Sequence, residues 1–487
     1  MAEHTALDQT LENTAIDPDD LAICLRVLEH AAELDKDHPD SVTVQRAVGH
    51  MFKKLKQRRR TAARDIISTA DKAVIAATAT GSPNRIDDET AGIPISGSVI
   101  DSGTAGTLLR ARPCYICKQK YTRVDAFYHQ LCPECAARSH AKRDARTDLS
   151  GKRALLTGGR AKIGMYIALR LLRDGAHTTV TTRFPNDAIR RFTAQPDSAD
   201  WLHRLRIVGI DLRDPAQVVA LADDVAAQGP LDILINNAAQ TVRRSTGSYS
   251  ALVEAENGPL PAGELPDVIS FGKTMQAHPA SITASLTPTL TGADITDLAL
   301  IAGSATPERI SQGVAIDAGG LVPDLAHTNS WVQTVAEVDA TELLEVQLCN
   351  SVAPFILISR LRPAMAAAAG RRKYVVNVSA MEGVFGRAYK GAGHPHTNMA
   401  KAALNMLTRT SAREMFEADN ILMTAVDTGW ITDERPHYTK IRLAEEGFHA
   451  PLDLVDGAAR VYDPIVRGED GDDVYGVFLK DYESSAW

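Results

Sequence analysis

The sequence contains few cysteines and few aromatic residues, and it lacks long apolar runs. Six cysteines occur in 487 residues, and aromatic side chains make up 5% of the chain. The first stretch, MAEHTALDQTLENTAID, has neither a basic region nor an apolar core, so it does not resemble a secretory signal. No apolar run reaches the roughly 18 residues that a membrane helix needs. We therefore expect a cytoplasmic protein without membrane contact, whose cysteines are thiols or metal ligands rather than disulfides.

Length and charge limit the organisation further. A chain of 487 residues exceeds one ordinary domain. Its net charge of −8 argues against a molecule whose whole surface binds nucleic acid. Changes in composition predict a helical region over 1–78, a linker over 79–112, a cysteine-containing module over 113–147 and a nucleotide-binding domain over 148–487.

The N-terminal region shows two helical patterns. Asp17 is a candidate N-cap before Pro18, and leucines follow at helical spacing. A second pattern runs from about residue 42 to residue 67 and carries a basic cluster: Lys53, Lys54, Lys56, Arg58, Arg59, Arg60 and Arg64. We interpret this cluster as a solvated helix face. The alternative is a binding surface for nucleic acid or an acidic protein.

Four of the cysteines form two CxxC pairs. Cys114 and Cys117 make the first pair, and Cys132 and Cys135 make the second. Four thiolates at this spacing can bind one tetrahedral Zn²⁺. Such a shell leaves no position for water, so the spacing predicts a structural zinc rather than a catalytic one. The alternative is a redox-active set of thiols.

Residues 154–183 have the pattern of a strand, a glycine turn, a helix and a second strand. Apolar residues 154–156 run into Thr157-Gly158-Gly159, and helical spacing follows from Ile163. Residues 178–182 are β-branched throughout, which favours a second strand. The glycine turn lets backbone N–H groups approach a pyrophosphate at the start of a helix. This stretch therefore predicts a dinucleotide site.

The alternation of strands and helices continues to the end of the chain. We expect strands over 205–210, 231–235, 373–379 and 421–426, with an edge strand over 476–479, and helices over 215–227, 342–361 and 400–416. This order predicts an α/β fold, a doubly wound and mostly parallel sheet. The stretch 241–340 is rich in Pro, Gly, Thr and Ser, so we expect a lid or binding insertion there.

Short motifs follow the predicted strands, and together they resemble a known superfamily. They are Thr157-Gly158 with Ile163-Gly164, Asp211, Asn236-Asn237-Ala238-Ala239, Asn350, Ser379, Lys401 and Thr428-Gly429. Their order is similar to that of the short-chain dehydrogenase/reductase superfamily. The resemblance covers 151–487 and implies a Rossmann fold, a nicotinamide dinucleotide, a small-molecule substrate that is a carbonyl or alcohol, and a homo-oligomer.

The resemblance also assigns candidate site residues. Catalysis would use Asn350, Ser379 as a hydroxyl donor to the substrate carbonyl, and Lys401, which also binds the ribose hydroxyls. The cofactor-binding candidates are Thr157, Gly158, Arg160, Lys162, Ile163, Gly164, Arg183, Asp211, Leu212, Asn237, Ala238, Lys401, Thr428 and Gly429. Arg183 follows the second strand, where NAD-binding sites usually have an acid, and Lys162 adds a second cation. This favours NADP over NAD.

One departure from the family bears on function. The family's tyrosine stands four residues before the lysine, and here that residue is Thr397, whose hydroxyl is too weakly acidic to donate the proton. We expect Pro395 to keep residues 389–397 in a loop that supplies His394 or His396 as the acid. The alternatives are that these histidines only shape the loop, and that the protein senses or scaffolds with bound NADP(H) without turnover.

Overall fold

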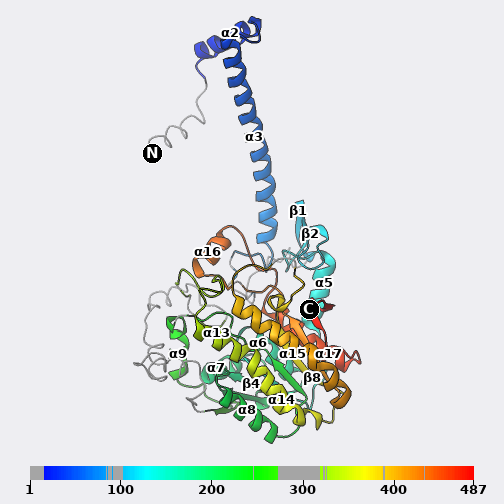
Figure 1. Ribbon diagram of the computed structural model, residues 1–487. Helices are drawn as coiled ribbons and strands as arrows, with labels where there is room; N and C mark the ends of the chain where they lie inside the picture. Colours follow the sequence, from blue (N-terminus) through cyan, green and yellow to red (C-terminus); the bar gives the residue numbers. More distant parts are fainter. Residues whose placement is uncertain are drawn as a thin grey trace, which may run out of the picture. The chain divides into compact units, whose positions relative to one another are not determined.

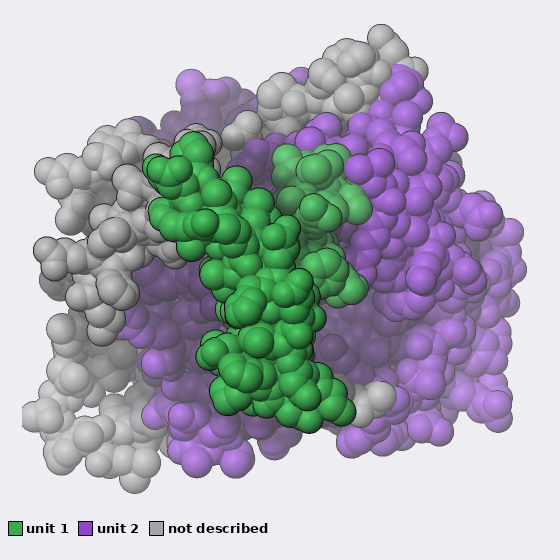
Figure 2. All heavy atoms as spheres, turned by 90° about the horizontal axis from the view of Figure 1, so that it is seen from above, with its two compact units in different colours: residues 1–71 green, residues 72–487 purple. Residues whose placement is uncertain are grey.

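The computed structural model describes residues 16–83, 85, 90, 102–244, 246–271, 319–321, 324, 326–387, 390–432 and 434–487. The chain divides into two compact units, residues 1–71 and 72–487, shown in different colours in Figure 2. Much of the 241–340 insertion, including 272–318, lies outside the described residues.

The first unit consists of helices in its described part. Helix α2 spans Pro18–Glu33, and Asp17 caps it, as predicted, by accepting hydrogen bonds from the N–H groups of Asp19 and Asp20. Helix α3 spans Pro39–Ala76 and carries the basic cluster, whose side chains are exposed. This helix starts earlier and ends later than the sequence pattern predicted.

The second unit is built on a nine-stranded sheet in the order β11-β10-β9-β8-β6-β3-β4-β5-β7 (Figure 1). Its strands are β3 (Arg153–Leu156), β4 (His177–Thr182), β5 (Leu205–Gly209), β6 (Ile233–Asn236), β7 (Asp267–Ser270), β8 (Lys373–Ser379), β9 (Ile421–Asp427), β10 (Phe478–Lys480) and β11 (Glu483–Ser485). Neighbouring strands run parallel except β10 and β11, which pair antiparallel. The predicted doubly wound, mostly parallel sheet is confirmed.

Helices cover both faces of this sheet. The described helices from α6 onward are α6 (Lys162–Arg173), α7 (Pro185–Thr193), α8 (Pro215–Ala227), α9 (Ser250–Asn257), α13 (Ala340–Gln347), α14 (Ala353–Ala366), α15 (Pro395–Asp419), α16 (His437–Glu445) and α17 (Leu454–Glu469). One core lies between the sheet and α6, α7 and α17, and a second between the sheet and α8, α14 and α15, the last two lying in front of the strands in Figure 1. Ala154 and Leu156 join the first core and Leu155 the second, as the two-residue period of a strand requires.

Part of the insertion extends the sheet. Strand β7 pairs parallel with β5 at the edge, and α9 packs against α7. Among the described residues, one helical stretch, Ala340–Ala366, is long and apolar enough to cross a membrane by length and composition, and half of its most apolar window is buried in the protein. Because its α14 part faces the second core, it has the character of a core helix.

The cysteine module forms a small subdomain within the second unit. Strands β1 (Thr104–Pro113) and β2 (Lys120–Asp125) pair antiparallel, and α5 (Pro133–Asp144) follows them. Leu108 and Val124 are buried in a third core with Cys114 and Cys132. Strand β1 thus occupies the end of the predicted 79–112 linker, because its partner strand lies downstream and composition alone does not show the pairing.

The start of α15 corrects a second expectation. Residues 389–397 do not all form a loop, because α15 begins at Pro395 and includes His396 and Thr397. Proline suits the first helical position, since its missing N–H group would have no helical partner there. His394 precedes the helix in the left-handed conformation, with φ 45°.

Candidate functional site

The parallel strands place the predicted motifs along one edge of the sheet. The glycine turn follows β3, Arg183 follows β4, Asp211 comes just after β5, Asn237 follows β6, Ser379 ends β8, and Thr428 follows β9. Carboxyl ends of parallel strands form the ligand-binding crevice in sheets of this type. The structure therefore brings most of the sequence-predicted residues to a single edge.

The glycine turn is packed too tightly for larger residues. Gly158 has a φ of 72°, and a Cβ atom added to Gly164 would lie 1.9 Å from the carbonyl oxygen of Gly158. Lys162, at the family's middle glycine position, adopts a φ of 52°, and Ile163 follows it in α6. The close approach of turn and helix is the cradle that a pyrophosphate requires.

Thr157 and Asn237 connect the glycine turn to the end of β6. The Thr157 hydroxyl accepts hydrogen bonds from the N–H groups of Asn237 and Ala238, each at 3.0 Å. The Asn237 side chain donates to the carbonyl oxygens of Thr157 and Gly158, at 3.0 and 3.1 Å. These residues shape the turn, and the hydrogen bonds of their side chains are made to the backbone of the protein.

Arg183 lies at the end of β4, where its exposed side chain donates a hydrogen bond to the Tyr249 hydroxyl of the insertion at 3.4 Å. Its guanidinium lies over the rings of Phe184 and Tyr249, 5.7 and 5.3 Å from their centroids. The nearby positive charge of Arg183 lowers the pKa of the Tyr249 hydroxyl although burial opposes the shift. Sequence reasoning missed Tyr249, because no motif marks it within the insertion.

The N-terminus of α7 next to Arg183 already holds a carboxylate. Glu256 accepts hydrogen bonds from the N–H groups of Asn186 and Asp187, at 2.8 and 3.0 Å. Arg160, a predicted cofactor ligand, forms an ion pair with Asp187 and donates to the Gly319 carbonyl at 2.8 Å. An acidic residue of the insertion thus occupies a place suited to an anion.

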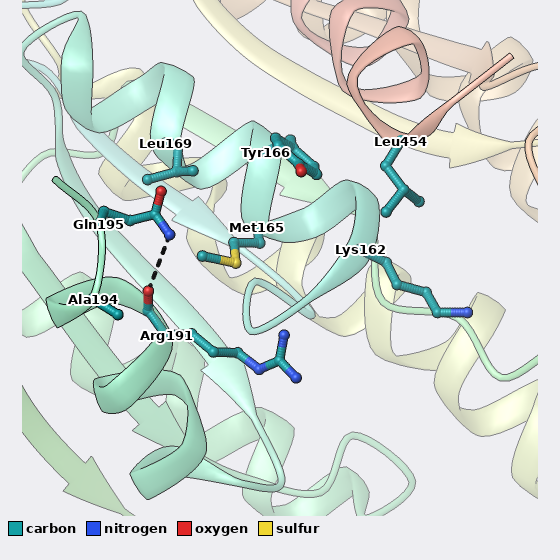
Figure 3. Close-up of a pocket in the computed structure, with 8 residues that line it drawn as sticks. All are labelled: Lys162, Met165, Tyr166, Leu169, Arg191, Ala194, Gln195 and Leu454. Atoms are coloured by element: carbon teal, nitrogen blue, oxygen red, sulfur yellow. Dashed lines mark hydrogen bonds between the residues drawn. The ribbon is translucent and has the colours of Figure 1, made fainter. Parts of the chain in front are cut away.

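Lys162 has a different neighbourhood from Arg183. The charges of Arg244 and Lys162 hold the pKa of Glu434 below its usual value although burial opposes this. A pocket beside α6 is lined by Lys162, Met165, Tyr166, Leu169, Arg191, Ala194, Gln195 and Leu454 (Figure 3). Figure 3 shows the Lys162 ammonium pointing away from Arg191, so this pocket does not gather the two charges around one ligand.

Asp211 and Leu212, two of the predicted cofactor-binding residues, follow β5. Asp211 pairs with Arg213 at 2.7 Å, and Arg213 also reaches Glu345 at 2.9 Å. Arg213 is also close enough to Tyr249 for its charge to act on the Tyr249 hydroxyl. The ion pairs of Asp211, Arg213 and Glu345 therefore lie beside the insertion. Leu212 is partly buried against the second core.

Asn350 lies in a π-helical turn, Leu348–Val352, between α13 and α14. Its amide accepts from the Gln240 N–H at 2.7 Å and donates to the Gln240 carbonyl at 2.9 Å. Such turns are frequent at functional sites. Here the buried Asn350 side chain holds the segment that follows β6 through its two hydrogen bonds with the Gln240 backbone.

The structure gives the Ser379 hydroxyl a partner within the protein. Its hydroxyl donates to Asn405 Oδ1 at 2.6 Å, and the side chain is 2% exposed. Asn377, two residues earlier, donates to Thr408 on the same helix, so both residues use the face of β8 that packs on α15. Ser379 therefore connects the strand to the helix, and its expected role as a hydroxyl donor to a substrate carbonyl stays a prediction.

Lys401 is buried at the same edge. Its Nζ donates to the Val378 carbonyl at 2.8 Å, and burial lowers the pKa of Lys401 to about 8. Burial, followed by the nearby negative charge of Asp211, raises the pKa of the Cys349 thiol to about 11. Sequence reasoning did not include Cys349 among the site residues, although it stands directly before the predicted Asn350.

The candidate acids differ in their surroundings. The Thr397 hydroxyl donates to the Thr241 carbonyl at 3.4 Å. His396 is 1% exposed, neither ring nitrogen has a hydrogen-bond partner among the described residues, and its Nε2 is 3.9 Å from a Glu342 oxygen. Burial, followed by the charge of His394, lowers the pKa of His396. His396 is therefore held in its neutral form.

His394 is partly exposed and firmly oriented. Its ring stacks on Trp331 with centroids 4.0 Å apart, and its Nδ1 is 2.8 Å from the Trp331 carbonyl oxygen. A carbonyl only accepts, so Nδ1 carries the donated proton and Nε2 is the nitrogen that can gain or lose one.

The turn after β9 is held by a carboxylate at its start. Asp427 accepts from the Gly429 N–H at 3.2 Å, and burial raises the pKa of Asp427 to about 6. Gly429 has a φ of 81°, which a residue with a side chain rarely adopts. Asp427 pairs with Ser379 across the sheet, so the turn with Thr428 lies beside the end of β8.

The four cysteines come together as their spacing predicted. The sulfur atoms of Cys114, Cys117, Cys132 and Cys135 lie within 4.8 Å of one another. Four soft sulfur ligands with two CxxC pairs are the donor set of a structural zinc site. This four-cysteine cluster fits Zn²⁺.

The comparisons with known proteins agree with this architecture. Residues 152–254 match the family model described as short chain dehydrogenase. An uncharacterised protein of Acanthamoeba polyphaga mimivirus is 32% identical over 369 residues, which cover 73% of this chain and 71% of that protein. A probable oxidoreductase of Streptomyces antibioticus is 40% identical over 91 residues, or 19% of this chain and 30% of that protein.

One solved structure that the chain matches is a short chain dehydrogenase from Burkholderia cenocepacia in complex with NADP. It shares 20% identity and a TM-score of 0.42, over 68% of this chain and 97% of that one. The family model matches the part of the chain that carries the glycine turn. The chain belongs to the short-chain dehydrogenase/reductase superfamily and is an oxidoreductase of that type.

Proposed function

We propose that the protein is an NADP(H)-dependent oxidoreductase that interconverts a carbonyl and an alcohol, with NAD(H) as the weaker cofactor. The observation that carries the proposal is the glycine turn, in which a Cβ on Gly164 would lie 1.9 Å from the Gly158 oxygen. A turn this closely packed on its helix suits a pyrophosphate. Arg183, at the end of β4, adds the cation that a 2′-phosphate needs.

Lys401 is the residue best suited to the ribose side of the site. An ammonium group has three N–H donors, and one of them is used by the Val378 carbonyl. The remaining donors can bind ribose hydroxyls, and the positive charge favours nearby oxygen atoms. When bound, the dinucleotide supplies or accepts a hydride at its nicotinamide ring.

His394 is the best candidate for the proton donor. Trp331 fixes its ring from two directions, by stacking and through the carbonyl near Nδ1, and leaves Nε2 for proton exchange. Buried, neutral His396 and the Thr397 hydroxyl meet this requirement less well. An imidazolium is a competent acid near neutral pH.

The experiment is NADPH oxidation with a panel of aldehydes and ketones. The unmodified protein should oxidise NADPH in a substrate-dependent way and prefer it to NADH. Lys401→Ala should abolish turnover, and Arg183→Asp should narrow or reverse the cofactor preference. Undiminished turnover in Lys401→Ala would refute the chemistry assigned to this site.

A second candidate function is a sensor or scaffold that binds NADP(H) without turnover. The observation that favours it is the state of the expected hydroxyl donors: Ser379 is bonded to Asn405 and Thr397 replaces a tyrosine. In that case no member of the carbonyl panel would oxidise bound NADPH, and changing His394 would alter no rate.

We also propose that the four-cysteine cluster holds a structural Zn²⁺. Cys114 and Cys132 lie in the third core with Tyr121 and Val124, so a bound metal would join the two CxxC pairs at the side of this small core. Metal analysis of the full-length protein tests this.

The first unit is the proposed contact with a partner. Apolar side chains of α3, among them Met51 and Phe52, are more than half exposed, and the basic cluster follows them. An acidic protein surface, including that of a second copy, matches both features better than a solvated helix face. This proposal is tested by comparing the molar mass in solution of the unmodified protein with that of a variant in which the basic cluster is replaced by glutamine.

A further inference from the structure

The cysteine module contacts the turn that follows β9. Tyr115 lies between the first two cysteines of the cluster, and its hydroxyl accepts a hydrogen bond from the Trp430 backbone N–H at 2.9 Å. The backbone of Tyr115 is itself fixed, because its N–H donates to the Gln130 carbonyl at 2.8 Å. A residue between two of the predicted zinc ligands thus holds the Trp430 N–H group in the turn after β9.

The same turn is packed on the module by an apolar contact. Ile431 is 2% exposed and belongs to the core that contains Cys114 and Cys132. Ile163, from the glycine turn and the start of α6, packs against this core as well. The cysteine module, the β9 turn and the dinucleotide turn therefore share one set of side-chain contacts.

The position of the turn links these contacts to the cleft. Asp427 pairs with Ser379 across the sheet, and Val378, one residue earlier, accepts the Lys401 hydrogen bond. A displacement of residues 428–431 would consequently change the border of the site near Lys401. Gly429, with its positive φ, and the Asp427 carboxylate fix the start of the turn, whereas Tyr115 fixes its next N–H group.

We propose that Tyr115 is a positioning residue that makes the dinucleotide affinity of the cleft depend on metal occupancy of the four-cysteine cluster. The inference rests on the proposed function, because it assumes that the cleft binds a dinucleotide. Because such coupling is reciprocal, a bound dinucleotide must also raise metal affinity by the same factor.

The test compares two tyrosines of the same module in the full-length protein. Tyr115→Phe removes the hydroxyl that holds Trp430. Tyr121→Phe is the matched control, since the Tyr121 hydroxyl donates to the His129 carbonyl at 2.7 Å, inside the module. Cobalt(II) absorption of each variant reports whether the cluster still binds metal.

Two measurements are made on each variant. Hydrogen exchange of the segment 428–432 measures how well the backbone amides of the turn are protected, and it needs no dinucleotide. Titration with NADPH, with zinc bound and after chelation, reads the affinity. We expect Tyr115→Phe to accelerate exchange of the Trp430 amide about 10-fold and to weaken NADPH binding about 3- to 10-fold, as the loss of one hydrogen bond allows. Chelation should weaken binding in the unmodified protein and have little further effect in Tyr115→Phe.

The outcomes separate this inference from the proposed function. Unchanged exchange in Tyr115→Phe, or equal effects in Tyr121→Phe, would overturn the role of Tyr115. NADPH affinity that is insensitive to chelation would overturn the metal dependence. If no variant binds NADPH or NADH, the proposed function fails and the metal dependence with it, while the exchange data still decide whether Tyr115 holds the turn.

Discussion

The carboxylate of Glu256 accepts a hydrogen bond from the backbone N–H of Asp187 at 3.0 Å, at the start of α7. Its other oxygen accepts from the N–H of Asn186 at 2.8 Å, so a side chain of the insertion fills the first turn of the helix next to Arg183. A negative charge here is stabilised by the helix dipole. The same charge repels a second anion, such as the 2′-phosphate of NADP(H).

Neutralising this carboxylate should therefore change the cofactor preference. In Glu256→Gln, NADPH affinity should rise roughly 10-fold, whereas NADH affinity should stay nearly constant, because a charge-assisted contact becomes available to the phosphate. Glu254→Gln is the matched control, since Glu254 is exposed on the same helix α9. Fluorescence titration with both cofactors measures the ratio. An equal change for NADPH and NADH would show that Glu256 does not face the 2′-phosphate.

Lys401 should set the alkaline limit of activity. Burial lowers its pKa to about 8, so the ammonium loses its proton above that pH and with it the charge that binds ribose oxygens. Turnover and NADPH affinity should fall between about pH 8 and pH 9 in the unmodified protein. Lys401→Arg should remain flat across this range because arginine stays charged. A profile of the unmodified protein that stays level to pH 10 would contradict this.

Lys401 should also make the free energy of unfolding depend on pH. Between its folded pKa of about 8 and the ordinary lysine pKa of 10.5, the unfolded chain holds a proton that the folded chain lacks. This contribution to the free energy of unfolding therefore rises with pH across that window. Urea unfolding of the unmodified protein and Lys401→Met at pH 7.5 and pH 9.5 measures it, and a larger pH dependence in the variant would contradict it.

Zinc should be present at about one ion per chain. Cys132→Ser should lose the metal and destabilise the module of residues 104–144, because metal-binding energy is folding energy in such small sites. Cys24→Ser is the control, since Cys24 is exposed and outside the cluster. Freshly prepared, unchelated protein without zinc would refute the metal site.

His394 should carry the proton transfer to the substrate oxygen during turnover. His394→Gln should lower turnover roughly 10²- to 10⁴-fold with little change in NADPH affinity. His396→Gln should have a smaller effect on turnover, since His396 is buried as a neutral ring. Thr397→Tyr could then raise a weak rate by supplying a phenol one helical turn before Lys401. Equal losses in both histidine variants would refute the assignment to His394.

Sequence reasoning succeeded where local pattern and structure coincide. The βαβ unit around Gly158 and Gly164 was predictable because glycine, apolar period and β-branched strand act within one short stretch. The four-cysteine cluster was equally predictable from the spacing of its ligands. The fold class followed from the order of strands and helices.

The errors and omissions concern contacts between distant parts of the chain. The role of Ser379 depends on which face of β8 packs against Asn405, and the motif alone does not show that face. Tyr249 and Glu256 lie in an insertion whose composition carries no periodic signal. The expectation that Pro395 holds a loop is wrong, because proline also suits the first position of a helix, where its missing N–H group costs no hydrogen bond.

The central claim is that the turn from Thr157 to Gly164 binds a nicotinamide dinucleotide. Its most direct test is calorimetric titration of NADPH into the full-length protein, into Gly164→Ala and into Gly49→Ala, each checked for folding by circular dichroism. The added Cβ at Gly164 would lie 1.9 Å from the Gly158 oxygen, whereas a Cβ at Gly49 would meet nothing within 4 Å. We predict one NADPH bound per chain in the unmodified protein and in Gly49→Ala, and no measurable binding in Gly164→Ala. Absence of binding in the unmodified protein, or unimpaired binding in folded Gly164→Ala, would contradict the account.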